Sequence, residues 1–194
     1  MRNISRDDLA NLPIRRYEGT VSLVATAKEL EQARADFRQE RVIGFDTETR
    51  PSFKKGERHL PCLVQAATAR AVYIFQLSRL DVFPALVELL ARGETVKVGV
   101  GLAHDVRQLK LVFPFTVNNV VDLGVVARRR GLGQTGVRNL AGMLLGFRIP
   151  KGNRTSNWAA PRLSPAQITY AATDAWACRE LYLRFESLGL LSGS

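Results

Sequence analysis

Residues 42–50 of this 194-residue chain, Val-Ile-Gly-Phe-Asp-Thr-Glu-Thr-Arg, constrain its fold more than any other stretch. The apolar run predicts a buried strand, and it ends on two acids, Asp46 and Glu48. Side chains two apart on a strand point to the same side, so we expect both carboxylates to meet at the strand's carboxyl end. Two like charges close together in a partly buried place are unfavourable unless they are protonated or bind a cation. The pattern therefore predicts a site for a hard divalent metal ion.

Strand-like and helix-like patterns alternate along the rest of the chain. The predicted strands lie at about 20–25, 42–50, 63–68, 71–75 and 97–100, and the predicted helices at about 26–39, 81–92, 103–112, 122–130, 137–145 and 164–187. The last helix has the clearest start, because Ser164 is followed by Pro165 and then by Gln167. Alternating strands and helices are typical of an α/β fold. The tight turn between the third and fourth strands makes the predicted sheet mixed rather than wholly parallel.

The chain is long enough for one domain with its own core, and we predict that this domain spans residues 21–190. Residues 1–20 are polar and contain Pro13, which interrupts any helix, so we expect an N-terminal extension that lies over the body of the domain. No apolar stretch approaches the roughly 18 residues of a membrane-spanning helix, and the polar start has no signal-peptide core. Cys62 and Cys178 are too few for a disulfide framework, so a cytoplasmic location is expected.

The charge of the chain is unusual. It has 28 Lys and Arg against 18 Asp and Glu, which gives a net charge of +10. Such an excess favours a polyanionic partner such as nucleic acid. An anionic membrane surface is the weaker alternative, because no segment is apolar enough to enter a bilayer. Arg128, Arg129 and Arg130 end a predicted helix, where the helix dipole explains them better than nucleic acid does.

Two further acids stand where acids are not expected. Asp105 follows a predicted strand, and Asp174 lies within an apolar stretch of the last helix, where Asp is a poor helix former. Tyr170 is four residues before Asp174 and therefore lies on the same face of that helix. Taken singly, Asp105 is explained by the dipole at a helix start and Asp174 by surface exposure. Together with the pair at the end of the central strand, they form a set of four acids and one tyrosine.

This set resembles the DEDD 3′–5′ exonucleases of the tyrosine subclass, whose three motifs are FDTET, a Gly-rich strand followed by Asp, and YxxxD. The chain is also similar to the exonuclease domains of the Werner syndrome helicase and its relatives, over residues 98–105, 122–123, 139–140, 144–146, 150–151, 156–158 and 163–174. In total the resemblance covers about residues 20–187. It implies an RNase H-like (DnaQ-like) fold, in which helices flank a mixed sheet.

The resemblance also implies roles for the five residues. Asp46, Glu48 and Asp174 would bind two divalent ions, Mg²⁺ or Mn²⁺, directly, and Asp105 would act mostly through water. Tyr170 would orient the attacking water, because a phenol with a pKa of about 10 is a weak base at neutral pH. The implied reaction is hydrolysis of phosphodiesters from the 3′ end of single-stranded or 3′-recessed DNA or RNA, with release of nucleoside monophosphates.

Two alternatives use the same fold. One is a catalytically inert module that binds nucleic acid or serves as a scaffold, and the other is an oligoribonuclease specialised for very short RNA. The presence of all four acids and the tyrosine favours catalysis over the inert module. DNA and RNA both stay open as substrates, because such a site reads a phosphodiester and a 3′ end rather than the identity of a base.

Basic residues near the motifs are candidates for phosphate contacts, although each alone is better explained as a solvated charge. They are Lys54, Lys55 and Arg58 after the first motif, Arg107 and Lys110 one turn apart after Asp105, and Lys151, Arg154 and Arg162 before the last helix. Phe53 and Leu102 are candidates to stack against terminal bases, with a place in the hydrophobic core as the alternative.

Overall fold

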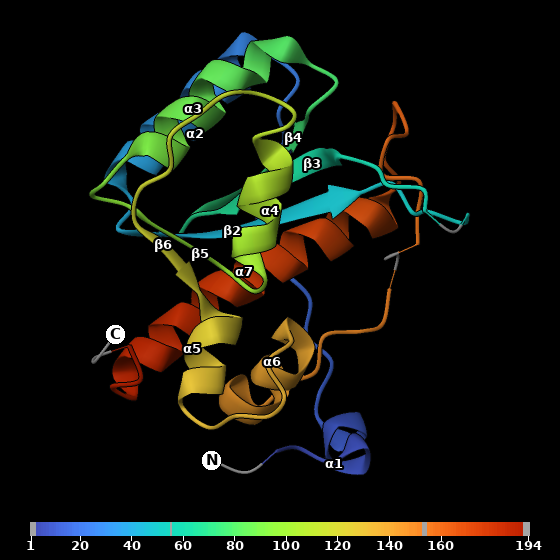
Figure 1. Ribbon diagram of the computed structural model, residues 1–194, viewed down its shortest axis with the longest axis vertical. Coiled ribbons are helices and arrows are strands. Elements are labelled where there is room, and N and C mark those ends of the chain that lie inside the picture. Colours follow the sequence, from blue (N-terminus) through green and yellow to red (C-terminus); the bar gives the residue numbers. More distant parts are fainter. Residues whose placement is uncertain (1–2, 55, 153–154, 192–194) are drawn as a thin grey trace.

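The computed structural model describes residues 3–54, 56–152 and 155–191 (Figure 1). Six strands form one sheet in the order β1-β4-β3-β2-β5-β6. They are β1 (Thr20–Leu23), β2 (Val42–Thr49), β3 (Pro61–Ala67), β4 (Ala71–Gln76), β5 (Val96–Gly99) and β6 (Val120–Asp122). In the described part of the chain, β3 runs antiparallel to β2 and β4, and the other neighbouring strands pair in parallel. The mixed α/β sheet predicted from the sequence is therefore confirmed.

Helices cover both faces of this sheet (Figure 1). They are α1 (Arg6–Asn11), α2 (Ala27–Gln39), the 3₁₀ turn η1 (Leu80–Val82), α3 (Phe83–Ala91), α4 (Leu102–Leu109), α5 (Leu123–Arg129), α6 (Val137–Leu145) and α7 (Pro165–Ser187). Helices α2, α3 and α4 share one hydrophobic core with the sheet, whereas α7 packs on the opposite face through Ala171, Ala172 and Ala175. Helices α5 and α6 lie against the C-terminal half of α7. This arrangement places α7 directly beside the central strand β2.

Side chains along β2 point alternately to the two faces of the sheet. Ile43 and Phe45 point into the core shared with α2, α3 and α4. Gly44 points the other way, and a Cβ atom added there would overlap the carbonyl oxygen of Ala175 in α7. Because glycine has no side chain, β2 and α7 can pack closely together at this position. The two acids of β2 continue the Gly44 side of the strand, so both face α7.

The clearest helix signals in the sequence are confirmed. Thr26 with Glu29 forms a capping box at the start of α2, and Ser164 with Gln167 forms another at the start of α7. Both helices end where their patterns predict, α2 at Gln39 and α7 at Ser187. These boundaries are set by local hydrogen bonds, which a local sequence pattern can encode.

Helix α1 and strand β6 are not predicted by the sequence pattern, and α4 ends at Leu109, three residues before the predicted end. Helix α1 forms inside the N-terminal extension and ends at Asn11, two residues before Pro13, so the proline follows the helix rather than preventing it. Strand β6 lies partly where a helix over 122–130 is predicted, and α5 begins only at Leu123 with Asp122 as its cap. A strand of three residues is too short to show a two-residue period, which is why the sequence pattern does not reveal it.

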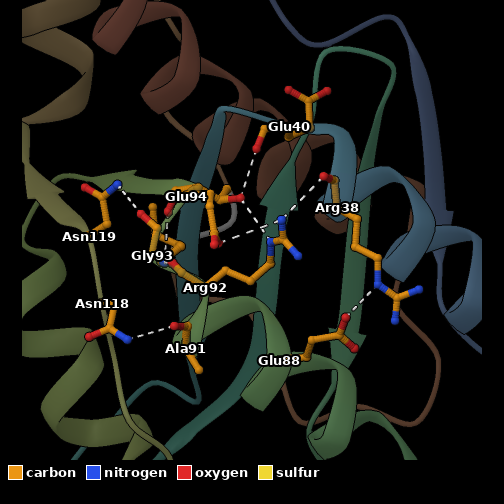
Figure 2. A network of polar contacts seen from close by, with 11 residues as sticks. Arg38, Glu40, Glu88, Ala91, Arg92, Gly93, Glu94, Asn118 and Asn119 are labelled. Carbon is orange, nitrogen blue, oxygen red and sulfur yellow. Dashed lines mark hydrogen bonds and ion pairs between the residues drawn. The ribbon is translucent and has the colours of Figure 1, made fainter.

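A network of polar contacts surrounds the end of α3 and the segments that lead into β5 and β6 (Figure 2). The side-chain amides of Asn118 and Asn119 donate to the backbone carbonyls of Ala91 and Gly93, each at 2.8 Å. The buried ammonium of Lys97 donates to two further carbonyls in the turn before β5. These bonds satisfy carbonyls at the end of α3 that would otherwise lack partners, and so they fix the connections that enter β5 and β6.

Among the described helices, none combines the length and the apolar character that crossing a membrane requires.

Candidate active site

Three carboxylates meet beside the carboxyl end of β2. Asp46 and Glu48 come from β2, and Asp174 comes from the middle of α7. One ligand oxygen from each lies within 4.8 Å of the others. The convergence of the β2 pair follows from the two-residue period of a strand, whereas the third acid arrives because α7 packs on the same side of β2. The acid in mid-helix is therefore buried in a cluster rather than exposed on the surface.

The fourth acid approaches from the other face of the sheet. Asp105 lies in the first turn of α4, and Thr47, which points away from the α7 side of β2, hydrogen-bonds to its carboxylate. Asp105 lies outside the group of three acids that are within 4.8 Å of one another. Its charge still acts on Asp46, whose pKa it helps to raise. Four acids thus approach the end of β2 from both sides of the sheet.

The electrostatics of the cluster favour protonation when no cation is present. Burial is the main cause that raises the pKa of Asp46 well above its usual range, and the charges of Asp174, Glu48 and Asp105 raise it further. Burial also raises the pKa of Asp174 to about 6, although the hydrogen bond from Tyr170 acts in the opposite direction. The pKa of Asp105 likewise rises to about 6 because the group is buried. A bound cation would relieve this repulsion between like charges.

The donor set fits a hard divalent cation. Oδ1 of Asp174 is buried and has no hydrogen-bond partner among the described residues, which is unusual for a buried carboxylate oxygen. The three clustered residues offer only carboxylate oxygens, which Mg²⁺ and Mn²⁺ prefer over nitrogen or sulfur. The side chains of Asp46, Glu48 and Asp174 are therefore the ones that can hold such an ion.

Tyr170 lies one helical turn before Asp174, and its hydroxyl hydrogen-bonds to that carboxylate. Its ring packs against the buried ring of Trp158, with the two centroids 5.8 Å apart. Burial, together with the charges of Asp174 and Glu48, raises the pKa of the phenol above its usual range. The hydroxyl is therefore protonated at neutral pH and can only donate a hydrogen bond or accept one as a neutral group.

The structure places the predicted nucleic-acid contacts in different environments. Phe53 is 83% exposed in the loop after β2, which excludes a core role, whereas Leu102 is buried in the hydrophobic core, the alternative considered for it. Arg107 and Lys110 are exposed on α4, and the Lys110 ammonium lies 5.8 Å from the centre of the Phe115 ring. Lys54 is exposed in the loop after β2, and Lys55 and Arg154 lie outside the described residues. The nucleic-acid roles of these residues stay predictions.

A cavity of about 1150 Å³, here called the α1 pocket, opens beside Tyr170 and Asp174. It is formed by α1, the start of α6, the segment 148–152 and α7, and its basic lining residues are Arg6, Arg138, Arg148 and Lys151. Of these four, only Lys151 is a candidate from the sequence. Arg6 lies more than a hundred residues before Arg138 and Arg148, so no spacing pattern in the sequence reveals that it meets them.

Comparison with known proteins decides the family. A family model described as 3′–5′ exonuclease matches residues 21–189. The chain belongs to this 3′–5′ exonuclease family. The match includes β2, α4 and α7, the three elements that carry the four acids and Tyr170.

Individual relatives agree with this exonuclease assignment. The chain is 29% identical over 189 residues to the bifunctional 3′–5′ exonuclease/ATP-dependent helicase WRN of Mus musculus. The matched region covers 92% of this chain and 14% of WRN. The chain is also 33% identical over 165 residues to ribonuclease D of Gluconacetobacter diazotrophicus. That match covers 82% of this chain and 41% of the ribonuclease. The chain therefore spans less than half of either relative.

The crystal structure of the Nibbler EXO domain of Aedes aegypti shares the fold of this exonuclease-family chain. The two superimpose with a TM-score of 0.77 at 24% identity, over 92% of this chain and 93% of the other. The RNase H-like fold implied by the sequence motifs is confirmed.

Proposed function

We propose that this protein is a metal-dependent 3′–5′ exonuclease that hydrolyses phosphodiesters from the 3′ end of a nucleic-acid strand and releases nucleoside monophosphates. The observation that carries the proposal is the cluster of three buried or half-buried carboxylates whose oxygens lie within 4.8 Å, with Tyr170 beside it. Family membership and a net charge of +10 support it. The expected substrates are single-stranded or 3′-recessed DNA or RNA.

The carboxylates of Asp46, Glu48 and Asp174 would hold the ions, and Asp105 would contribute its charge from the α4 side of β2. Two Mg²⁺ or Mn²⁺ ions, when bound, lower the pKa of an attacking water and stabilise the charge on the leaving 3′ oxygen. Because the acids favour protonation in the free protein, ion binding releases protons from the cluster. Turnover should therefore fall at acidic pH, where protons compete with the ions.

Tyr170 would act as a positioning group for the attacking water. Its raised pKa keeps the phenol neutral, so it orients the water by a hydrogen bond rather than removing the water's proton. The water gives up one proton to solvent and its oxygen forms a new bond to phosphorus, while the bond from phosphorus to the 3′ oxygen breaks. The 3′ oxygen leaves with the bonding electron pair and takes a proton from solvent, which leaves the phosphate on the 5′ carbon of the released nucleotide.

The decisive experiment follows cleavage of a strand labelled at its 5′ end, incubated with Mg²⁺, with Mn²⁺ or with a chelator. A ladder that shortens from the 3′ end with either ion, and intact strand in chelator, is the expected result. The Asp46→Asn variant serves as the control for contaminating nucleases and should be inactive. An intact strand under every metal condition would instead support the inert-module alternative.

The same assay distinguishes the remaining substrate classes. DNA and RNA strands of matched sequence, each in several lengths, are compared at equal concentration. A rate that is high only for the shortest RNA would identify the oligoribonuclease alternative. Comparable rates on longer strands would support a general exonuclease.

A further inference from the structure

We propose that helix α1 forms part of the substrate-binding site and that Arg6 binds a phosphate of the nucleic-acid strand other than the one being cleaved. This inference rests on the proposed function, since it assigns a further contact to the same substrate. The family match begins at residue 21, so α1 lies outside the matched domain. Arg6 nevertheless lines the same pocket as Tyr170 and Asp174.

The segment before α1 is held against the domain by specific contacts. The backbone N–H of Ile4 donates to Oε1 of Gln134 at 2.9 Å, and Nε2 of Gln134 donates back to the carbonyl of Ile4 at 3.0 Å. Leu9 of α1 packs against α6 at Gly142, where an added Cβ atom would lie 2.5 Å from the Leu9 Cδ1 atom. The absence of a side chain at Gly142 therefore creates the seat for α1.

The segment after α1 is fixed as well. The backbone N–H of Arg148 donates to the carbonyl of Pro13 at 2.9 Å, and the N–H of Arg15 donates to the carbonyl of Arg148 at 3.1 Å. Bonds on both sides of α1 hold the backbone of Arg6 at the pocket before any ligand arrives. A phosphate that binds there would immobilise little more than the Arg6 side chain. Little conformational entropy would be lost, which favours affinity.

The charge of the α1 pocket suits a polyanion. Four of its lining residues are basic, and Asp174 is the one acid among the described lining residues. Within the described part of the chain, none of the four basic side chains is within ion-pair distance of an acid. Arg138 does act at longer range on Asp174, whose pKa its charge lowers, so the lining keeps an excess of positive charge, with four basic residues against one acid. An excess of positive charge next to a site that would cleave phosphodiesters favours the phosphates of the same strand.

Two of the arginines are held in orientation by backbone carbonyls. Nε of Arg138 donates to the carbonyl of Ile149, and Nε of Arg148 donates to the carbonyl of Leu12, each at 3.1 Å. Each bond uses one of the five N–H donors of a guanidinium, and the terminal nitrogens can donate to phosphate oxygens. The pocket therefore presents positioned donors around Arg6.

The pocket has room for a ligand that extends beyond the scissile phosphate. Its volume of about 1150 Å³ exceeds the roughly 300–1,000 Å³ of a typical small-ligand site. Because Tyr170 and Asp174 lie on its wall, a strand with its scissile phosphate at the acids has room to continue along α1.

The test compares Arg6→Gln with Arg16→Gln, a matched change at an exposed arginine of the same extension that does not line the pocket. Two substrates are used with the full chain, a single-stranded oligonucleotide and the p-nitrophenyl ester of thymidine 5′-monophosphate, which carries one phosphate only. Losing one charge-assisted phosphate contact should raise the KM for the oligonucleotide about tenfold in Arg6→Gln. The loss of kcat/KM on the oligonucleotide should exceed the loss on the ester by a similar factor.

Binding of a fluorescent oligonucleotide in chelator tests Arg6 without turnover. The Kd of Arg6→Gln should rise, and the slope of log affinity against log salt should fall by about one relative to Arg16→Gln. Equal Kd and equal slope in the two variants, at unchanged melting temperatures, would overturn the assignment of Arg6. A parent protein that binds the strand but cleaves neither substrate would refute the proposed function instead, and the binding result would still decide the role of α1.

Discussion

Gly44 in β2 lies against the backbone carbonyl of Ala175 in α7, and this contact sets the spacing between the two halves of the acid cluster. Asp46 is two residues after Gly44, and Asp174 is one residue before Ala175. The distance between their carboxylates therefore depends on how closely the strand and the helix pack. Ala171 and Ala172, which are also small and buried, extend the close contact along α7.

Replacing Gly44 by Ala should push α7 away from β2. Overpacking of this kind typically lowers the free energy of unfolding by about 1–3 kcal/mol. Because the acids would separate, activity should fall more than the remaining folded fraction explains. Gly93→Ala is the matched control, since an added Cβ there meets no atom within 4 Å. Chemical denaturation and initial rates check both effects, and wild-type activity in a folded Gly44→Ala protein would show that the spacing is not critical.

Asp46→Asn should abolish cleavage while leaving the free protein at least as stable as the parent. The substitution removes one charge from a repulsive cluster, so the melting temperature in chelator should hold or rise. Saturating Mg²⁺ or Mn²⁺ should raise the melting temperature of the parent, because the ions bind only the folded state, and the variant should lose this gain. Thermal scans with metal and with chelator measure both, and a metal-induced rise of equal size in the variant would contradict the assignment of Asp46 as a ligand.

Tyr170→Phe should lower kcat strongly with little change in KM. Loss of a hydrogen bond that positions the attacking water typically costs about 10²- to 10⁴-fold in rate. Metal-induced stabilisation should persist, because no carboxylate is lost. Tyr182→Phe, the same change three turns further along α7, is the control. Single-turnover rates provide the measurement, and equal rates for the two variants would limit Tyr170 to a packing role.

Asp105 and Asp174 should contribute more to the stability of the metal-free protein as the pH falls from neutral. The carboxyls of Asp105 and Asp174 have pKa values of about 6 in the folded protein, whereas an unfolded Asp has a pKa of about 4. Between these values these two acids bind more protons in the folded state than in the unfolded state, so their contribution to the free energy of unfolding increases as the pH falls through this window. Above about pH 6 both states are ionised and the full repulsion is present.

The double variant Asp105→Asn/Asp174→Asn isolates this effect. The Arg partners of Glu88 and Glu186 lower the pKa of these two carboxyls, and groups of this kind contribute the opposite pH dependence. The difference in melting temperature between parent and double variant should therefore be largest near neutral pH and shrink toward about pH 4. A difference that is constant with pH would mean that the two acids are not perturbed in the folded state.

Binding of nucleic acid should weaken with salt, and part of that dependence is predicted to come from α4. Replacing both Arg107 and Lys110 by Gln should lower the slope of log affinity against log salt by about two if both contact phosphates. Arg128→Gln/Arg129→Gln removes the same charge at the end of α5 and is the matched control. Anisotropy titrations at several salt concentrations give the slopes, and equal slopes for the two double variants would remove α4 from the nucleic-acid path.

Local patterns in the sequence were enough to predict side-chain directions along a strand and the starts of helices. The strand period placed Asp46 and Glu48 on one side of β2, the capping boxes marked the starts of α2 and α7, and the four-residue spacing put Tyr170 on the same helix face as Asp174. Each of these follows from hydrogen bonds or side-chain directions within a few residues, which is the range over which sequence patterns act.

The resemblance to a known family implied that the acids and Tyr170 share one site, but the placement of each side chain depends on tertiary packing. Packing places Asp105 on the opposite face of the sheet from the three clustered acids, with a hydrogen bond to Thr47, and it buries Leu102 while leaving Phe53 exposed. It also seated α1 on α6, so that arginines more than a hundred residues apart line one pocket. Distances of this kind depend on how whole elements pack, and packing is set by side-chain volumes summed over many residues rather than by any single spacing in the chain.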